Sequence, residues 1–320
     1  MTKERSDVVN IGILGCANIA RKNVRAVSLS EDNIVVTAVA SRHKEKAEAF
    51  IKSNPGLAGA TAYGSYEALL ADPNVDAVYL PLPAGLHVEW VKKAAAAGKH
   101  VLCEKPIALT LEGAENIIRA CEQAGVQFMD GTMWVHNART AEMASAIRTD
   151  LGQLKSVISA FAFPAPEAFL KDDVRCKPEL DGLGCLGDLG WYCTRASLWA
   201  NAYEPPTAVQ AHAGALRNEA GVLMHVGATL TWADGRRASF ECSFDRAPVQ
   251  QLEVAGTKGV LELSDFVIPT HEDTGAYRLR DAAFLAELDV AVTQRTTEHQ
   301  VPMQRQQEVG MWEDFARFCG

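Results

Sequence analysis

The stretch Val9–Ala20, VNIGILGCANIA, decides the fold of the first half of the chain. An apolar, β-branched run passes directly into a glycine-containing turn and then into a helical pattern, as in a dinucleotide-binding strand, loop and helix. The three fingerprint positions are Gly15, Ala17 and Ala20. Alanine is a common variant at the third position, but Ala17 places a methyl group where phosphate approaches. An ordinary strand-to-helix turn is therefore an alternative interpretation of this loop taken alone.

The end of the next strand, Ile34–Ala40, bears on the choice between NAD and NADP. An NAD enzyme places a carboxylate there for the ribose 2′-hydroxyl, whereas this chain has Ser41 and Arg42, followed by Lys46. A planar arginine fork can hold a 2′-phosphate. Cations at the start of a helix are unfavourable unless an anion compensates them. The pattern favours NADP (NADPH) as the cofactor, with a solvated basic helix start as the alternative.

Outward from this region, β-branched runs alternate with helical patterns to about residue 130, which indicates a parallel sheet with crossover helices. The predicted strands are Val9–Leu14, Ile34–Ala40, Ala77–Leu80, His100–Cys103 and Val126–Met129, and the predicted helices include Glu45–Ser53, Leu86–Ala97 and Leu111–Ala124. We therefore expect an α/β chain whose residues 1–132 form a Rossmann domain.

Beyond Trp134 the pattern changes to a helix at Ala138–Thr149 and then to successive strands. These are Val157–Phe163, Thr207–Ala213, Leu223–Trp232, Arg237–Phe244, Gln251–Ala255 and Val260–Leu263. Turn signals lie between them, at Asp234-Gly235 and Gly256–Gly259. Residues 133–320 are predicted to form an α+β domain with a large, mainly antiparallel open sheet and a C-terminal helix near 304–319.

Composition excludes several classes of partner. The chain has 320 residues, 48% of them hydrophobic and 22% charged, which suits two globular domains. A net charge of −9 argues against nucleic acid or an anionic membrane as the main partner. The eight cysteines form no C-x-x-C pair, and no apolar run approaches the roughly 20 residues that span a bilayer. With no signal-like N-terminus, we expect a cytoplasmic protein with reduced thiols and no metal site.

Two further motifs follow predicted strands. Pro81–His87, PLPAGLH, follows the fourth strand of the expected fold, and Cys103–Pro106, CEKP, follows the fifth. Together with Ser41-Arg42 they resemble the Gfo/Idh/MocA oxidoreductase family over nearly the whole chain. Asp130–Thr140, DGTMWVHNART, is similar to plant members and to the branch of dimeric dihydrodiol dehydrogenase and NADP-dependent xylose dehydrogenase.

The resemblance implies roles for the CEKP motif. Lys105 would contact substrate and nicotinamide ribose, Pro106 would follow a cis peptide, and His87 would lie near the nicotinamide or cap its helix. Lys105 is also a sensible choice physically, because ligands bind at the carboxyl ends of parallel strands and a partly desolvated ammonium can hydrogen-bond an alcohol oxygen. A surface lysine is the alternative. Glu104 is expected to position the loop.

The segment Gly182–Tyr192, GLGCLGDLGWY, leads into a helix with Asp188 and Tyr192 four residues apart on one face. The family pattern G-G-x-x-x-D-x-x-x-H keeps Asp188 here but has Tyr192 in place of histidine, as in the branch above, where the tyrosine is the proposed acid/base. An adjacent cation would stabilise its phenolate. An N-cap aspartate with a core tyrosine is the alternative.

The candidate site residues form three sets. Those for catalysis are Lys105, Tyr192 and Asp188. Those for the cofactor are Gly15, Cys16, Ala17, Asn18, Ile19, Ser41, Arg42, Lys46, Pro81, Leu82, His87, Glu104 and Lys105. Those for the substrate are Trp134, His136, Arg175, Asp188 and Tyr192.

These residues predict an NADP-dependent oxidoreductase that moves hydride between nicotinamide and a hydroxyl-bearing carbon of a small molecule, namely a sugar, cyclic polyol or dihydrodiol. Two alternatives are an enzyme that retains its cofactor for elimination, glycoside cleavage or epimerisation, and a non-catalytic NADP sensor. The resemblance also implies a homodimer formed through an apolar face of the second sheet. Family members usually continue into a C-terminal helix that packs on the first domain. Because this chain ends earlier than they do, at Gly320, a further segment with pocket or cofactor contacts is left open.

Overall fold

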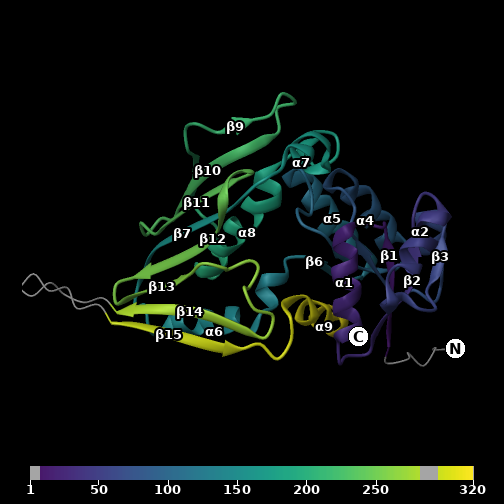
Figure 1. Cartoon of the computed structure of the whole chain (residues 1–320), viewed down its shortest axis with the longest axis horizontal. Coiled ribbons are helices and arrows are strands. Elements are labelled where there is room, and N and C mark those ends of the chain that lie inside the picture. Colours follow the sequence, from purple (N-terminus) through teal and green to yellow (C-terminus); the bar gives the residue numbers. More distant parts are fainter. Residues whose placement is uncertain (1–7, 282–294, 320) are drawn as a thin grey trace, which may run out of the picture. The chain divides into compact units, whose positions relative to one another are not determined.

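The computed structural model describes residues 8–281 and 295–319 and divides the chain into two compact units (Figure 1). The first consists of Met1–His136, Glu179–Asp181 and Gln306–Gly320, and the second of Asn137–Pro178 and Gly182–Arg305. The division at His136 lies just after the boundary expected from sequence. The C-terminal helix, which the sequence analysis placed in the second domain, belongs to the first unit.

The first unit contains a parallel six-stranded sheet with the strand order β3-β2-β1-β4-β5-β6. The strands are β1 (Val9–Leu14), β2 (Ile34–Ala40), β3 (Thr61–Tyr63), β4 (Ala77–Leu80), β5 (His100–Cys103) and β6 (Phe128–Asp130). The order reverses between β1 and β4, and such a switch point is where α/β sheets bind ligands. Only β6 departs from its predicted bounds, because Gly125 ends the preceding helix in the left-handed conformation. The three-residue β3 was not predicted.

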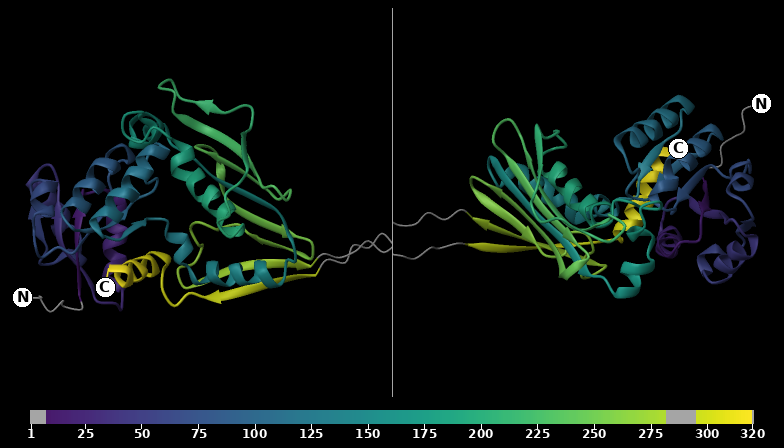
Figure 2. Two further views of the ribbon diagram at one scale, coloured as in Figure 1. Left: turned by 180° about the vertical axis from the view of Figure 1, so that it is seen from behind. Right: turned by 90° about the horizontal axis from the view of Figure 1, so that it is seen from above.

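Helices cover both faces of this sheet (Figure 2). They are α1 (Asn18–Leu29), α2 (Lys44–Lys52), α3 (Tyr66–Leu70), α4 (His87–Ala96), α5 (Leu111–Ala124) and α9 (Gln307–Cys319), with short 3-10 turns at Pro55–Leu57, Ala84–Leu86 and Met133–His136. Successive side chains of β1 enter the apolar cores on opposite faces of the sheet: Ile13 belongs to one core and Leu14 to the other.

The C-terminal helix α9 packs against α1 in the first of these cores. Val309, Trp312 and Phe315 are buried there, and Lys22 of α1 pairs with Glu308 at 2.7 Å. Residues 307–319 thus form the predicted C-terminal helix, and this helix packs on the Rossmann fold.

The second unit contains a nine-stranded sheet with the order β15-β14-β13-β12-β7-β11-β10-β8, in which β9 also pairs with β10. Its strands are β7 (Leu154–Pro164), β8 (Ala208–Ala211), β9 (Leu216–Arg217), β10 (Leu223–Thr231), β11 (Arg237–Ser243), β12 (Asp245–Gly256), β13 (Gly259–Leu263), β14 (Thr274–Asp281) and β15 (Thr296–Pro302). Only β7 and β11 pair in parallel, so the sheet is mainly antiparallel, as expected. Strands β9, β14 and β15 were not predicted.

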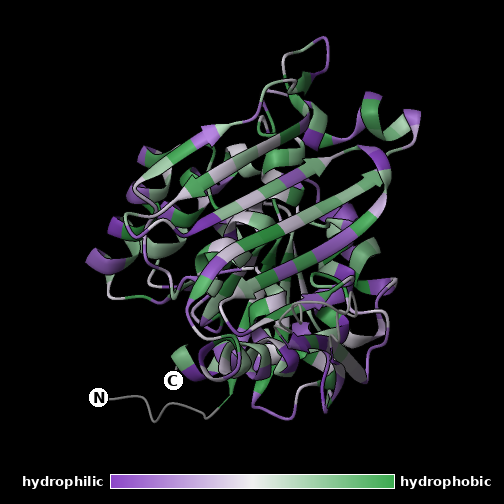
Figure 3. Cartoon of the chain, turned by 90° about the vertical axis from the view of Figure 1, so that its left-hand side faces the viewer, coloured by the Kyte–Doolittle hydropathy of each residue, from purple (hydrophilic) through white to green (hydrophobic). Residues whose placement is uncertain are grey.

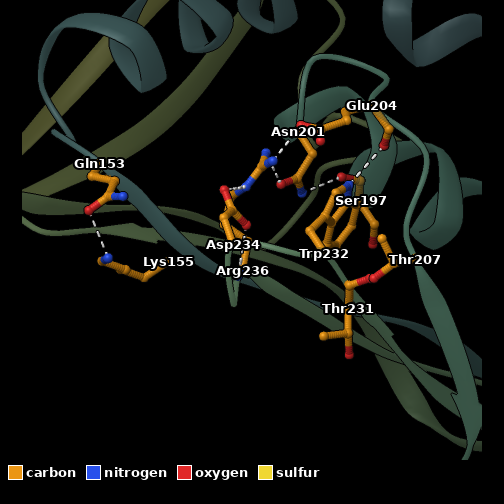
Figure 4. Close-up of polar contacts among 10 residues, drawn as sticks. All are labelled: Gln153, Lys155, Ser197, Asn201, Glu204, Thr207, Thr231, Trp232, Asp234 and Arg236. Atoms are coloured by element: carbon orange, nitrogen blue, oxygen red, sulfur yellow. Dashed lines mark hydrogen bonds and ion pairs between the residues drawn. The ribbon is translucent and has the colours of Figure 1, made fainter.

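Helices α6 (Ala138–Thr149) and α8 (Trp191–Ala200) belong to this unit, and α8 packs on β7 and β11. The short elements α7 (Glu167–Asp172), a 3-10 turn at Val174–Cys176 and a π-helical turn at Leu186–Gly190 lie between β7 and α8. Asn201 anchors the end of α8, because it accepts a hydrogen bond from Arg236 at 2.9 Å (Figure 4). Arg236 also pairs with Asp234, and Trp232 donates to the Glu204 carbonyl at 2.9 Å. This cluster fixes α8 to the β10–β11 turn.

The other face of the second sheet has a mixed composition (Figure 3). Ile158 is half exposed on β7, but the neighbouring strands carry Arg280 within 3.3 Å of Glu253 and 3.1 Å of Glu262. Strand register places Ile158 beside Glu253 and Glu253 beside Glu262. The structure therefore differs from the expected apolar face, since charged pairs occupy the strands next to Ile158.

Candidate active site

The loop after β1 is shaped to let an anion approach. Gly15 has φ +116°, and a Cβ there would lie 3.0 Å from Leu82 Cδ2, so glycine is required. Among the described residues no side chain caps α1 at Ala17, and the first turn of the helix carries no acidic residue. Asn18 and Ile19 are exposed at this helix start. Uncapped N–H groups at a helix N-terminus suit the pyrophosphate of a dinucleotide.

The end of β2 lies next to this loop. The Cys16 thiol contacts the Lys46 carbonyl oxygen at 3.8 Å. Partial burial raises the pKa of Cys16, while Lys46 and Ser41 act in the opposite direction. Ser41 is buried and Arg42 is exposed. The structure thus brings together the loop and the basic segment that the sequence assigned to one cofactor.

Tyr66 is a neighbour that the sequence analysis missed. Burial raises its pKa, and the nearby Arg42 partly offsets this effect. Its hydroxyl lies 3.9 Å from the position of a Cβ on Gly15, and its ring packs edge-on against Trp90 with centroids 4.7 Å apart. The residue begins α3, just beyond β3, so its place at the carboxyl end of a strand could be seen only once that strand was recognised.

His87 joins the two loops that carry the PLPAGLH and CEKP motifs. Its Nε2 lies 2.8 Å from the carbonyl oxygen of Leu82, and its Nδ1 lies 2.9 Å from the carbonyl oxygen of Pro106. Pro81 directly precedes Leu82 in the first of these loops. Burial lowers the pKa of the imidazole, although these carbonyls favour its protonation. The Lys105–Pro106 peptide bond is cis, which confirms that expectation.

Glu104 and Lys105 lie at the carboxyl end of β5 and are partly buried. The Glu104 carboxylate accepts a hydrogen bond from the Tyr79 hydroxyl at 2.6 Å, and its other oxygen lies 3.3 Å from the Lys105 backbone nitrogen. The Glu104 backbone N–H bonds to the Leu80 carbonyl at 3.2 Å. The loop is therefore tied both to β4 and to its own side chain.

Trp134 and His136 lie in the 3-10 turn that ends the first long segment. Trp134 is fully buried, and His136 Nδ1 lies 2.6 Å from Asp314 Oδ2 on α9. These contacts tie the turn to the C-terminal helix. Their predicted contact with substrate stays a prediction.

Asp188 and Arg175 meet in the second unit. Arg175 Nε lies 3.0 Å from Asp188 Oδ1, and its NH1 lies 3.0 Å from Asp173 Oδ1. Burial alone would lower the pKa of the guanidinium, but the two carboxylates together raise it above its ordinary value. Arg175 thus holds one oxygen of Asp188, and the carboxylate has a fixed orientation.

Tyr192 is the second residue of α8, which follows directly on the π-helical turn that contains Asp188. It is buried in α8, and its ring centroid lies 5.8 Å from that of Phe161. The sequence analysis expected one regular helix here, whereas the structure has a π-helical turn at Leu186–Gly190 before α8. Gly190 explains the close packing, because a Cβ there would lie 3.0 Å from the Cys242 sulfur. Such turns occur frequently at functional sites.

No group of three or more histidine, cysteine, aspartate or glutamate side chains within residues 8–281 and 295–319 could hold a metal ion. In the same residues no helix combines the length and the apolar character needed to cross a membrane. All eight cysteines lie in this described part and are free thiols, and Cys16 is the one that is not buried.

Family models match both units. The model of the oxidoreductase family with an NAD-binding Rossmann fold, Gfo/Idh/MocA, matches residues 9–132, and the model of the Gfo/Idh/MocA C-terminal domain matches residues 141–262.

Individual proteins agree with the family models. D-xylose 1-dehydrogenase (NADP(+)) 2 of Haloferax volcanii is 36% identical over 305 residues, which cover 89% of this chain and 90% of that protein. Trans-1,2-dihydrobenzene-1,2-diol dehydrogenase of Xenopus laevis is 31% identical over 80% of this chain and 75% of its own. A 3-ketoreductase of Actinomadura kijaniata, solved with NADP and TDP-benzene, matches with a TM-score of 0.82 and 26% identity over 97% of this chain and 89% of its own.

Proposed function

Because this chain belongs to the Gfo/Idh/MocA family of NAD(P)-dependent oxidoreductases, we propose that it transfers hydride between NADP and a hydroxyl-bearing carbon of a neutral sugar, cyclic polyol or dihydrodiol. The observation that carries the proposal is the position of Lys105. It follows β5 at the carboxyl edge of the sheet, next to the switch point between β1 and β4. Ligands bind at this edge of parallel sheets.

The residues around the loop fit a dinucleotide. Gly15 leaves open the space that a Cβ would fill, the uncapped start of α1 suits a pyrophosphate, and Arg42 is exposed for a 2′-phosphate. Tyr66 lies between Gly15 and Arg42 and is a further candidate contact. The NADP dependence of the Haloferax relative and the NADP bound to the ketoreductase support NADP over NAD.

The nicotinamide would accept or supply the hydride, and the protein would manage the proton. Tyr192 would take the proton of the substrate hydroxyl, and Lys105 would hydrogen-bond the same oxygen as negative charge develops on it. An ammonium brought beside this phenol by the bound substrate would favour its anion. Asp188, oriented by Arg175, would accept a hydrogen bond from a neighbouring substrate hydroxyl.

A neutral polyhydroxylated substrate fits the charges of the second unit. Arg175, the basic candidate there, already pairs with Asp173 and Asp188 and is therefore compensated. An acidic substrate would need an arginine or lysine cluster in addition. The named relatives act on xylose and on a dihydrodiol, both of which carry neighbouring hydroxyls.

A homodimer formed through the second sheet and a cytoplasmic location also remain predictions. Sedimentation equilibrium of the wild type and of Ile158→Glu tests the dimer. A dimer that dissociates in the variant would support the sheet face as the interface, and a monomeric wild type would contradict it.

The test of the activity is a titration of the purified protein with NADPH and NADH, followed by NADP⁺ and a panel of sugars, polyols and cyclic diols. We expect NADPH to bind more tightly and absorbance at the reduced-nicotinamide wavelength to rise with a substrate of this class. Tight NADPH binding without turnover on the panel would favour retained-cofactor chemistry or a sensor instead. An absence of binding would overturn the proposal.

A further inference from the structure

A chain of hydrogen bonds runs from the C-terminal helix to the loop that carries Lys105. Trp312 Nε1 of α9 donates to Asn23 Oδ1 of α1 at 2.8 Å. Asn23 Nδ2 donates to the Tyr79 hydroxyl of β4 at 2.8 Å, and Tyr79 donates to Glu104 Oε1 at 2.6 Å. Every donor points in the same direction, toward the carboxylate.

The chain is buried along its length. Trp312, Asn23 and Tyr79 are at most 2% exposed, and the Tyr79 and Trp312 rings also pack edge-on with centroids 5.4 Å apart. A buried polar group costs free energy unless it is hydrogen-bonded, and linked bonds in an apolar setting strengthen one another. Apolar side chains would fill the same core without that cost. The presence of a fully connected chain ending on Glu104 therefore points to a role for that end.

The Glu104 carboxylate is held on its remaining sides too. A Cβ on Gly131 would lie 3.3 Å from the carboxylate carbon, so the backbone of the segment after β6 lies against it. Its second oxygen lies 3.3 Å from the Lys105 backbone nitrogen. Because the carboxylate is immobilised by Tyr79 and also contacts the Lys105 backbone, the position of that backbone depends on the bond from Tyr79.

We propose that Tyr79 is a positioning residue for Lys105, and that Asn23 and Trp312 orient its hydroxyl toward Glu104. The proposal rests on the proposed function, in which Lys105 contacts the reacting oxygen. Tyr79 itself would contact neither substrate nor cofactor. Displacement of a catalytic group by about 1 Å can lower a rate by about a hundredfold, so the loss of one bond here has a measurable effect on turnover.

The test is Tyr79→Phe, which removes the hydroxyl and keeps the ring. We expect kcat to fall about 10- to 100-fold, the range for a lost hydrogen bond to a charged group. The Kd for NADPH should change less than about threefold, because the bond does not touch the nucleotide loop. Tyr63→Phe is the matched control, since Tyr63 donates to the Asp72 carboxylate at 2.7 Å in the same unit. It should keep kcat within about twofold of the wild type. Equal losses in the two variants would overturn the proposal.

Trp312→Phe provides a second variant at the other end of the chain. It removes the donor to Asn23 and keeps an aromatic ring, and we expect kcat to fall by about three- to tenfold. In the double variant with Tyr79→Phe the losses should not multiply, because both act through Glu104. Fully multiplicative losses would contradict a single chain.

A readout without turnover separates this proposal from the proposed function. The rate at which Lys105 reacts with an amine-modifying reagent, followed by peptide mass spectrometry over a pH series, reports the setting of its ammonium. We expect the pH profile to shift in Tyr79→Phe and to match the wild type in Tyr63→Phe. An unchanged profile would overturn the positioning role even in an active enzyme. If the wild-type protein turns over no substrate but the pH profile of Tyr79→Phe is still shifted from that of the wild type, the positioning role stands and the oxidoreductase step is removed.

Discussion

The two units hold their key carboxylates in different ways. Glu104 of the first unit is bound by the neutral hydroxyl of Tyr79, at the end of a buried hydrogen-bond chain. Asp188 of the second unit is bound by the charged, partly exposed Arg175. A hydrogen bond from a buried neutral donor is little affected by salt, whereas partly exposed ion pairs are screened by it. Both arrangements orient their carboxylate, but the second is expected to weaken as the salt concentration rises.

The largest effect that would test this comparison is expected at Lys105. Lys105→Ala removes the ammonium that we propose contacts the reacting oxygen. It should lower kcat by about a thousandfold or more, with NADPH binding largely kept. Stopped-flow turnover and fluorescence titration measure the two quantities. Lost NADPH binding with normal turnover at saturating cofactor would contradict the assigned role.

Tyr192→Phe should have the next largest effect. Loss of the phenol hydroxyl removes the proposed proton acceptor, so we expect kcat to fall by about a hundredfold while the substrate KM changes little. Steady-state kinetics with the best substrate of the panel measures both. A change confined to KM would show that Tyr192 only binds the substrate.

Arg42→Ala tests the nucleotide end of the first unit. The guanidinium would make charge-assisted hydrogen bonds to the 2′-phosphate, so its loss should raise the Kd for NADPH by about 10- to 100-fold. The Kd for NADH, which lacks that phosphate, should change by less than about threefold. Equal weakening of both nucleotides in fluorescence titrations would refute the 2′-phosphate assignment.

Arg175→Lys should have the smallest effect and sharpens the comparison directly. Lysine keeps the charge but loses the fork that contacts Asp188 and Asp173 together, so we expect the substrate KM to rise by about three- to tenfold. The wild-type KM should also rise between 0.05 and 0.5 M salt, on the order of twofold. The kcat loss in Tyr79→Phe should be the same at both salt concentrations. A salt-dependent loss in that variant would remove the distinction between the two arrangements.

Much of the first unit could be predicted from sequence because its strands are buried apolar runs. Four of its strands have the predicted bounds, whereas β3, with Thr61–Tyr63 between two helical patterns, is too short to give a signal. That omission also concealed Tyr66. In the second unit β14 and β15 were missed, because their alternation includes charged residues such as Arg278 and Glu298 that pair across strands.

The candidate site was predicted unevenly for a similar reason. Residues that follow strands in the first unit were located by motif. Cys16 contacts Lys46, and Tyr66 interacts with both Cys16 and Arg42, so the loop and the basic segment lie together. The pairing of Arg175 with Asp188 depends on a π-helical turn, which has no sequence pattern as strong as that of a regular helix. The hydrogen-bond chain joins Asn23 to Trp312 across 289 positions, and nothing local in either segment indicates the other.

The discontinuity of the first unit has a consequence for how the protein is made. The ribosome releases β1 and α1 long before α9, and the core around Val24 and Tyr79 stays uncovered until residues 307–319 emerge. Asn23 gains the hydrogen bond from Trp312 only at that stage. A nascent chain in which the second unit has already folded therefore still lacks the first donor of the hydrogen-bond chain, and the proposed orientation of Tyr79 would be among the last features completed in biosynthesis.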